Sequence, residues 1–456
     1  MSNIAAVRKF EIKPDNMTSG NSVYSHRNGN PLITFSISPQ EYYVRSKNLK
    51  LCFDVKLYTG TGGLPPNNND QDGTGAALNC LLNSRVGVAS LFSQVEINNA
   101  RNQNLETIRH YGRLMGSLLP SGAGWNEYTT YLSNEFGVSS NTEVQGRYCN
   151  RVMSVSMPIM AGIFLQGNDI PLTDRGGAGI GGLNLKFSLQ SSIQALQGVA
   201  GSWYEITNVS LMGEYAMPKG GQLPAISSYP FSGFSSFYSV INNNDQTSQI
   251  APSLGAVVST FTNFLPTTHI ANYGEDSFKT TPLLNKTGAN YDKVAPIKKI
   301  SYMRGGVLFP LQFQLDENEV ISRDLAALPG ISEYAGSSYD AQRQYYYSMA
   351  IRPRTSRAVD QLAGQNSEGF ATSNQDTYHN TVSGLLNVAP YENVYGVGIR
   401  VGDMLGVGNT ANFKTQNYST RIISALDGSS PMSSYTFFLY RSVINYDANG
   451  MISVVN

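Results

Sequence analysis

The clearest change of hydrophobic period along the chain lies between residues 86 and 120. At its start, Leu91, Val95 and Ile97 share one side of a two-residue alternation. Successive side chains of a strand point to opposite faces of the sheet. These residues are therefore predicted to form a strand with one buried face.

The spacing of the apolar residues then changes to three and four, at Leu105, Ile108, Tyr111, Met115 and Leu118. This spacing predicts an amphipathic helix, because it lines up side chains along one helical face. Asn104 is the predicted N-cap, Glu106 lies in the predicted first turn near the positive end of the helix dipole, and Pro120 is the predicted end.

Two-residue alternation recurs through the rest of the first half of the chain. It predicts strands at residues 33–37, 49–57, 155–157 and 183–189, and a last pair of short strands within residues 203–215. Pro218, Gly220, Gly221 and Pro224 then interrupt the pattern. We expect a domain boundary at this interruption.

Three stretches of the first half lack periodicity. Residues 1–30 predict an extended arm of low intrinsic order. Residues 59–75 consist almost entirely of Gly, Pro, Asn and Asp, and predict a long loop. Residues 120–150 are polar and rich in Gly around Trp125, and predict a second long excursion.

The second half repeats the order of these elements without repeating the residues. Alternating residues near 257 and at 309–315 predict strands, and a spacing of four at Ala341, Tyr345 and Met349 predicts a second helix between Ser338 and Pro353. Residues 435–439, a turn at 447–450, and Ile452 with Val454 predict a closing hairpin. Matching landmarks are about 224 to 236 residues apart, which indicates two tandem copies of one plan.

The predicted architecture is therefore all-β, with two tandem β-sandwiches that each carry one short inserted helix. Residues 1–30 are assigned to the arm, 31–218 to the first sandwich and 219–456 to the second. A chain of 456 residues exceeds the usual size of a single hydrophobic core, which agrees with two domains.

Composition adds an expectation about the surface. Charged residues make up only 14% of the chain, and 32 Lys and Arg balance 32 Asp and Glu. The chain also has 27 Tyr and 19 Phe. Aromatic residues are enriched and Lys and Glu depleted in interface cores, so extensive contacts between subunits are expected.

The compartment is inferred from what the sequence lacks. The N-terminus has no apolar core typical of a signal peptide, and no apolar run is long enough to span a bilayer. Cys52, Cys80 and Cys149 lack metal-ligand spacing and are expected to be reduced thiols in a cytosolic or nuclear setting. Glycosylation sequons at Asn16, Asn208, Asn285 and Asn417 are interpreted as chance matches.

Three motifs that resemble ligand sites fail their context tests. Gly177, Gly179 and Gly182 have the spacing of a dinucleotide-binding loop, but a predicted strand follows them where a helix would be needed. The run from Asn68 through Asp70 and Asp72 to Gly73 resembles a calcium loop, but Asn79 stands where a bidentate carboxylate belongs. Asp316, Glu317 and Glu319 follow a strand, where charged loop residues are ordinary.

The four histidines His26, His110, His269 and His379 are far apart in the sequence and lack the spacing of a metal motif. His110 is expected to be a partly exposed helix residue. No nucleophile elbow, phosphate-binding loop or CxxC motif is present. We therefore expect no catalytic, cofactor-binding or metal site, no cofactor, and no enzymatic activity.

Several stretches, in this order along a chain of this length, resemble the double jelly-roll major capsid proteins of double-stranded DNA viruses, particularly the polinton-like virus, adintovirus and virophage group. The stretches are SLFSQVEINN with the following LETIRHYGRLMGSLL, MSVSMPIMAGIFLQGNDIPL with LNLKFSLQ, WYEITNVSLMGEY, APIKKISYMRGGVLFPLQ, and SSYTFFLYRSVINYDANGMISVV.

The resemblance implies a structural protein that forms homotrimeric, pseudo-hexagonal capsomers tiling an icosahedral virion shell. It implies contacts with neighbouring capsomers and with penton and minor capsid proteins, and assembly in the host cytoplasm or nucleus; an inner membrane stays open as a partner. By position, residues 59–77, 120–150 and 355–385 would be tower loops or interface segments.

Two further expectations bear on partners. Residues 1–30 carry a net charge of about +2, too little to condense nucleic acid, so the arm is expected to tie neighbouring capsomers together or to touch an inner layer. No sequence-specific nucleic acid is expected as a partner. The alternatives are a viral spike or a carbohydrate- or receptor-binding β-sandwich protein, and a glycoside-active enzyme, which would need paired carboxylates in one cleft.

Overall fold

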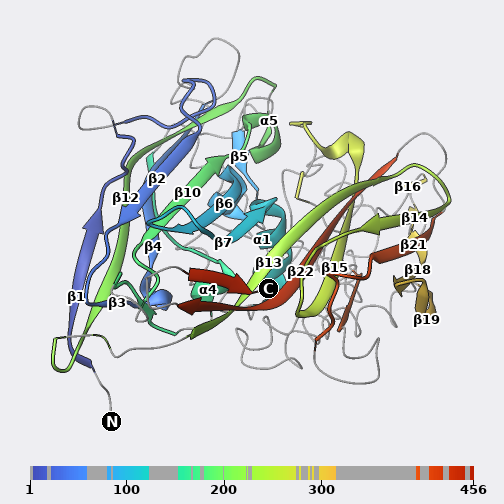
Figure 1. Cartoon of the computed structure of the whole chain (residues 1–456). Coiled ribbons are helices and arrows are strands. Elements are labelled where there is room, and N and C mark those ends of the chain that lie inside the picture. The colour runs from blue at the N-terminus through green and yellow to red at the C-terminus, as the bar shows by residue number, and fades with distance from the viewer. Residues whose placement is uncertain are drawn as a thin grey trace, which may run out of the picture.

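The computed structural model is dominated by antiparallel sheets (Figure 1). It describes residues 4–17, 22–58, 80–83, 86–122, 152–165, 168–174, 179–198, 200–221, 223, 228–273, 277–278, 286–287, 290–291, 297–314, 397–400, 410–424, 431–446 and 452–455. The predicted second helix, the turn at 447–450 and the long loop at 59–75 lie outside these residues.

The first half contains two large sheets. One has the order β1-β12-β4-β8, in which β12 pairs with β1 along one edge and with β4 along the other, and the short strands β3 and β9 extend it past β12. Its strands are β1 (Ile4–Ile12), β3 (Tyr43–Val44), β4 (Lys50–Tyr58), β8 (Val152–Pro158), β9 (Ile170–Pro171) and β12 (Trp203–Pro218).

The second sheet of this half has the order β2-β10-β6-β7. Its strands are β2 (Leu32–Ile37), β6 (Phe92–Asn99), β7 (Asn104–Arg109) and β10 (Leu183–Leu189), and a small pair, β5 (Cys80–Leu82) with β11 (Leu196–Gly198), lies apart from both sheets. Short helices connect the strands: η1 (Ser46–Asn48), η4 (Gly87–Leu91), α1 (Tyr111–Gly122), α4 (Gly162–Leu165) and α5 (Ser192–Ala195).

The second half repeats this arrangement. One sheet has the order β13-β22-β15-β20 with β23 added to β22, and the other has the order β14-β21-β18-β19. The elements are β13 (Ser228–Ile241), β14 (Asp245–Ile250), β15 (Val257–Pro266), η5 (Thr267–His269), β16 (Lys286–Thr287), β17 (Asn290–Tyr291), β18 (Ile297–Arg304), β19 (Val307–Gln314), β20 (Val397–Arg400), β21 (Tyr418–Ser424), β22 (Met432–Tyr446) and β23 (Ile452–Val455).

The four main sheets share one connectivity. In each of them the spatial order takes the first, fourth, second and third of its strands along the chain. Two four-stranded sheets of this kind, packed face to face, are the jelly-roll sandwich. The predicted all-β class, with the same sandwich plan used twice, is confirmed.

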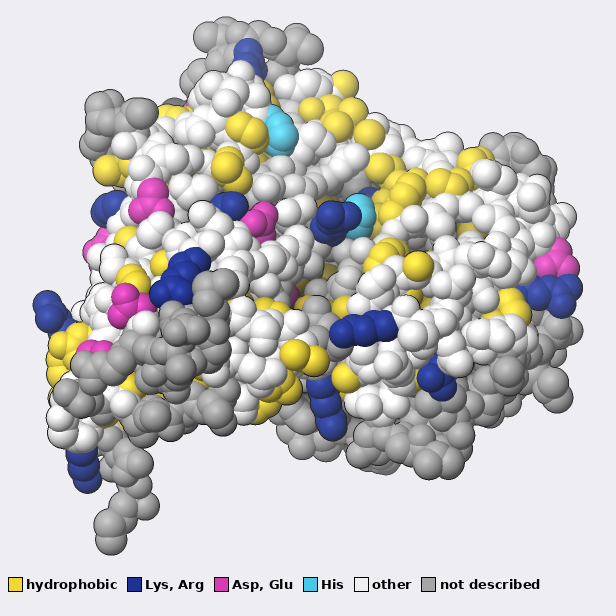
Figure 2. All heavy atoms as spheres, in the orientation of Figure 1, with side chains coloured by type: hydrophobic (Ala, Val, Ile, Leu, Met, Phe, Trp, Pro, Cys, Tyr) yellow, Lys and Arg dark blue, Asp and Glu magenta, His cyan; other side chains and the backbone are white. Residues whose placement is uncertain are grey.

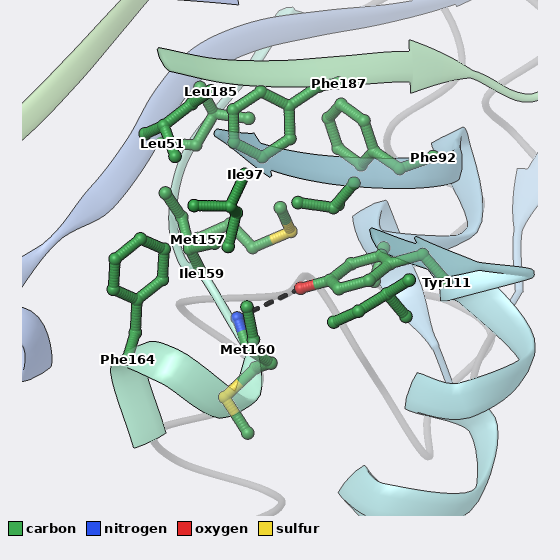
Figure 3. Close-up of a cluster of buried hydrophobic side chains, with 14 of the residues drawn as sticks. Leu51, Phe92, Ile97, Tyr111, Met157, Ile159, Met160, Phe164, Leu185 and Phe187 are labelled. Carbon is green, nitrogen blue, oxygen red and sulfur yellow. Dashed lines mark hydrogen bonds between the residues drawn. The ribbon is translucent and has the colours of Figure 1, made fainter. Parts of the chain in front are cut away.

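In each sandwich, buried side chains of one sheet pack against buried side chains of the facing sheet. In the first, Phe53 of β4 meets Phe92 of β6 edge-to-face with ring centroids 5.8 Å apart, and side chains from both sheets point toward one another around Leu51 and Phe187 (Figure 3). In the second, the ring centroids of Phe438 of β22 and Tyr418 of β21 are 5.0 Å apart. The predicted strands at 33–37, 49–57, 155–157 and 183–189 are confirmed, with their apolar residues buried.

The predicted helix after residue 104 begins later than expected. Asn104–Arg109 form strand β7, paired with β6, and α1 starts only at Tyr111 and continues past Pro120 to Gly122. Asn104 is therefore not an N-cap. The positive φ of 55° at His110 turns the chain from the strand into the helix, and the His110 carbonyl accepts the first helical hydrogen bonds from Arg113 and Leu114.

Two other expectations are corrected. Residues 203–215 do not form two short strands but lie in one strand, β12, whose register shifts between Thr207 and Ser210 around Asn208, with φ of 50°. The low order predicted for the arm is wrong for Ile4–Ile12, which pair with β12 as the edge strand β1. Among the described sheets, each takes its strands either from before residue 219 or from after residue 227. This agrees with a domain boundary near residue 218, which stays a prediction.

Candidate functional site: the junction between the two sandwiches

The two sandwiches meet where β13 of the second crosses β7 and α4 of the first, near the middle of the molecule (Figure 1). The approach is close enough to require glycine. A Cβ added to Gly162 would overlap the carbonyl oxygen of Ser232 and lie 2.7 Å from the Cα of Gly233. Backbone therefore packs directly on backbone here.

A buried carboxylate holds this contact together. Glu106 of β7 is 1% exposed, and its oxygens accept hydrogen bonds from the backbone N–H groups of Gly162 (3.1 Å), Ile163 (3.0 Å) and Phe234 (2.8 Å). The first two belong to the start of α4 and the third to β13. One side chain thus satisfies donors on both sandwiches, and these donors would otherwise be buried without partners.

The electrostatics of Glu106 reflect its burial. Desolvation raises the pKa of this carboxyl to about 7, although the three backbone donors act in the opposite direction. The sequence had suggested that Glu106 complements the dipole of its own helix. It instead lies on a strand and caps the N-terminus of a different helix, α4.

Further hydrogen bonds cross the junction away from Glu106. Side-chain donors and backbone acceptors of opposite sandwiches pair as follows: Ser236 Oγ to the Arg109 carbonyl (2.7 Å), Gln103 Nε2 to the Ile452 carbonyl (3.0 Å), Tyr273 OH to the Ser202 carbonyl (2.7 Å) and Tyr229 OH to the Asn168 carbonyl (3.3 Å). Asn263 of β15 also donates to Ser117 of α1.

Apolar packing joins the same surfaces. The hydrophobic cluster that fills the first sandwich continues into the second through Phe231, Phe261, Phe278 and Phe437. The Arg113 guanidinium lies 4.2 Å from the ring centroid of Tyr435, a cation–π geometry across the junction. Together with the hydrogen bonds above, these contacts join the two sandwiches through backbone packing, a shared hydrophobic cluster and a cation–π pair.

The structure separates the histidines that it describes. His26 Nε2 lies 2.9 Å from the Leu189 carbonyl oxygen, His110 is at the junction, and His269 ends η5. His110 precedes α1 instead of lying within it. His379 falls outside the described residues, and within the described ranges no group of His, Cys, Asp and Glu could hold a metal ion.

The other motifs weighed in the sequence have structural roles or lie outside the description. Gly182 has φ of 89°, and the strand predicted after it is β10. Asn16 donates to the Leu32 carbonyl, and Asn208 donates from the β12 bulge to Asp54. Cys52 and Cys80 are in the reduced thiol form, and Cys52 Sγ lies 3.3 Å from Ser156 Oγ. Gly177, the calcium-like run 68–79, Cys149, Asn285 and the acidic residues 316–319 lie outside the described residues.

The visible outer surface is sparsely charged, with hydrophobic side chains spread over both halves (Figure 2). Large apolar side chains that are exposed include Val7, Val152, Met212, Tyr238 and Val455. Among the described helices, none has the length and apolar character needed to cross a bilayer.

Sequence reasoning missed the residues that make the junction. Glu106 was assigned to the wrong element, and Gly162 and Arg113 were not singled out. One available signal was that Glu106 stands between the buried Leu105 and Ile108. A carboxylate in a strand flanked by core residues is rare without a dedicated partner.

No protein-family model matches the sequence, and no curated protein matches it. Solved structures match over almost the whole chain. The Sputnik virophage structure is 10% identical with a TM-score of 0.55, covering 100% of this chain and 89% of that one. The Faustovirus major capsid protein is 9% identical with a TM-score of 0.54, covering 97% and 90%. The PBCV-1 virus capsid model is 12% identical with a TM-score of 0.53, covering 99% and 96%.

At these identities the likeness shows the fold. The chain has the double jelly-roll fold of viral major capsid proteins, and the resemblance drawn from the sequence is confirmed at that level.

Proposed function

We propose that this protein is a non-enzymatic major capsid protein whose homotrimers form pseudo-hexagonal capsomers that tile an icosahedral virion shell. The observation that carries the proposal is the repeated strand order of two sandwiches locked into one block by Glu106 and the glycine contact. Three such blocks around a threefold axis present six similar sandwiches. A fixed angle between the two sandwiches is needed for that ring to close.

The composition supports self-association. A chain with 14% charged residues and equal numbers of acids and bases has little electrostatic repulsion between copies. Weak contacts repeated among many capsomers add up to a stable shell. The proposed partners are further copies, with penton and minor capsid proteins and an inner membrane as candidates, and the proposed location is the virion, assembled in the host cytoplasm or nucleus.

Residues 1–30 are proposed to tether neighbouring capsomers or to touch an inner layer. Because Ile4–Ile12 pair with β12 of the same chain, a tether would have to use the other edge of β1 or the residues around it. We retain the proposals that contact with the genome belongs to other proteins and that this chain has no sequence-specific nucleic acid as a partner. Salt-sensitive DNA binding by the purified chain with a steep slope would contradict it.

The rival reading as a glycan-binding spike requires an aromatic ring open to a sugar. Trp203 does not offer one. Its ring stacks on Tyr58 with the ring centroids 4.0 Å apart, and the Arg27 guanidinium lies 4.5 Å from the Trp203 ring centroid in a cation–π contact. Trp203 is only 9% exposed. This described tryptophan is therefore part of a structural stack.

Light scattering coupled to gel filtration, followed by negative-stain microscopy, tests the proposal. We expect a species of three times 49.6 kDa with hexagonal outlines that forms flat arrays or particles when concentrated. A monodisperse monomer at all concentrations would refute the capsomer. A soluble oligomer that binds a glycan array and forms no arrays would favour the spike.

A further inference from the structure

A cavity of about 240 Å³ opens at the junction, and both sandwiches line it. The first contributes residues from β6, the turn before α1, the first turn of α1, and the segment from the end of β10 into α5, and the second contributes residues from β13, β22 and the chain after η5. The lining residues are Phe92, Ser93, His110, Gly112, Arg113, Gln190, Gln194, Tyr238, Ile270, Phe278 and Tyr435. In Figure 2, a histidine and basic side chains lie beside hydrophobic ones near the middle of the visible face.

The polar part of the wall is positive. Arg113, a residue that is only 9% exposed, contributes a guanidinium, and the described lining residues include no Asp or Glu. Burial, together with repulsion from Arg113 and Arg109, lowers the pKa of His110 to about 4, so its imidazole is neutral at physiological pH. The first turn of α1, a helix of 12 residues, reaches the cavity at Gly112 and adds the positive end of its dipole.

Neutral donors complete that wall. Gln194 accepts a hydrogen bond from Gln190, which leaves the Gln194 amide N–H groups as donors. The apolar and aromatic part of the wall is formed by Phe92, Phe278 and Tyr435, and the Arg113 guanidinium lies 4.2 Å from the ring centroid of Tyr435 and 5.7 Å from that of Phe278. The cavity thus combines a cationic group with aromatic side chains suited to a ring or an alkyl chain, the usual composition of a small-molecule site.

We propose that this cavity binds a small organic carboxylate that has an aromatic or aliphatic body. The carboxylate would lie toward Arg113 and Gln194, and the body would pack against the aromatic residues. The volume is that of roughly eight water molecules, enough for a single ring with its carboxylate. Because such a ligand touches both sandwiches, it would stabilise the junction, and this holds whether or not the protein forms capsomers.

Ligand-observed saturation-transfer NMR and calorimetry on the full chain test the proposal with three probes. Benzoate has both features, acetate only the charge, and benzyl alcohol only the ring. We expect benzoate to bind at least about tenfold more tightly than either of the others and to raise the melting temperature. Equal binding of benzoate and benzyl alcohol, or no binding of benzoate at 10 mM or so, would overturn it.

Gln194→Glu is the matched variant. Glutamate can still accept the hydrogen bond from Gln190 but places a negative charge on the wall, so benzoate binding should fall at least about tenfold while benzyl alcohol binding is unchanged. Gln249→Glu, an exposed change on β14 outside the cavity, is the control and should bind like the parent. Benzoate binding that survives Gln194→Glu would place the ligand elsewhere.

Discussion

The two longest strands, β12 and β22, hold the same position in their sheets but have different surroundings. Along β12, partly exposed residues recur between the buried ones, and Met212 is 42% exposed. Along β22, all seven residues from Met432 to Phe438 are buried. The repeated plan is therefore not symmetric, since the second sandwich buries both faces of its central strand.

The reason is the junction. Tyr435 and Phe437 belong to the hydrophobic cluster that includes the first sandwich, while Phe438 belongs to the core of the second. Apolar and polar residues therefore do not alternate strictly along β22, and this strand carries buried Ser and Thr hydroxyl groups. Thr436 meets Thr262 of β15 at 2.9 Å, and Ser434 meets Ser239 of β13 at 2.6 Å. A strand buried on both faces needs small polar groups that satisfy one another where large side chains do not fit.

The largest effect should come from removing the carboxylate that ties β22's sheet to the first sandwich. Glu106→Ala leaves three buried N–H groups without acceptors and should cost about 3 to 5 kcal/mol. We expect calorimetry to show two transitions where the parent shows one. Glu96→Gln on β6, which changes a partly exposed ion pair with Lys186, is the control and should cost under about 1 kcal/mol. A single transition at the parent's melting temperature in Glu106→Ala would contradict the role of Glu106 in joining the two sandwiches.

Truncating each strand tests the asymmetry directly. Ile444 of β22 is fully buried, so Ile444→Ala should lower the free energy of unfolding by about 2 to 5 kcal/mol in urea titrations. Met212→Ala on β12 should change it by under about 0.5 kcal/mol, since that side chain is exposed. Equal losses would mean that β12 and β22 have equivalent surroundings.

The pH dependence should identify the junction carboxyl. Because burial raises the pKa of Glu106 from 4.5 to about 7, its contribution to stability is complete below pH 4.5 and is lost as the pH rises through 7. The loss is roughly 3 kcal/mol. Glu106→Gln should remove this component from unfolding free energies measured between pH 5 and 8. A parent and variant with parallel pH profiles would exclude Glu106 as its source.

The close approach at Gly162 should tolerate no methyl group. Gly162→Ala must push α4 away from the β13 backbone, which we expect to cost about 1 to 3 kcal/mol. Gly116→Ala in α1 is the matched control, because its Cβ would lie 3.4 Å from Val86 and 3.5 Å from the Phe278 carbonyl oxygen, ordinary contact distances. That change should be neutral or stabilising by thermal melting, since alanine favours the helix. A neutral Gly162→Ala would argue against the backbone contact.

The smallest effect concerns the hydroxyl pair of the second sandwich. Thr262→Val leaves the Thr436 hydroxyl without its partner and should cost about 1 kcal/mol. The double variant with Thr436→Val should cost less than the sum of the two single changes, as measured by a double-mutant cycle. Strict additivity would show that the pair is not coupled.

Local pattern was enough for several strands of the first sandwich, because the burial along those strands follows a period of two. Residues 33–37, 49–57 and 183–189 could be assigned without any tertiary information, and so could the repeated order of elements that indicated two sandwiches. The pattern failed at residues 104–109, where spacings of three and four continued from a strand into a helix. The apolar residues of β7 and α1 face one core, and a linear pattern cannot show the turn at His110 between them.

The sequence by itself determined the class of fold and its duplication, since both depend on the periodicity of apolar residues along the chain. Only the tertiary structure decided the junction, because its parts come from β7, α4, β13 and β22, which are far apart in sequence. The need for glycine at 162 and the burial of Glu106 arise when two surfaces meet. No local pattern encodes that meeting, and the proposed assembly of this protein depends on it.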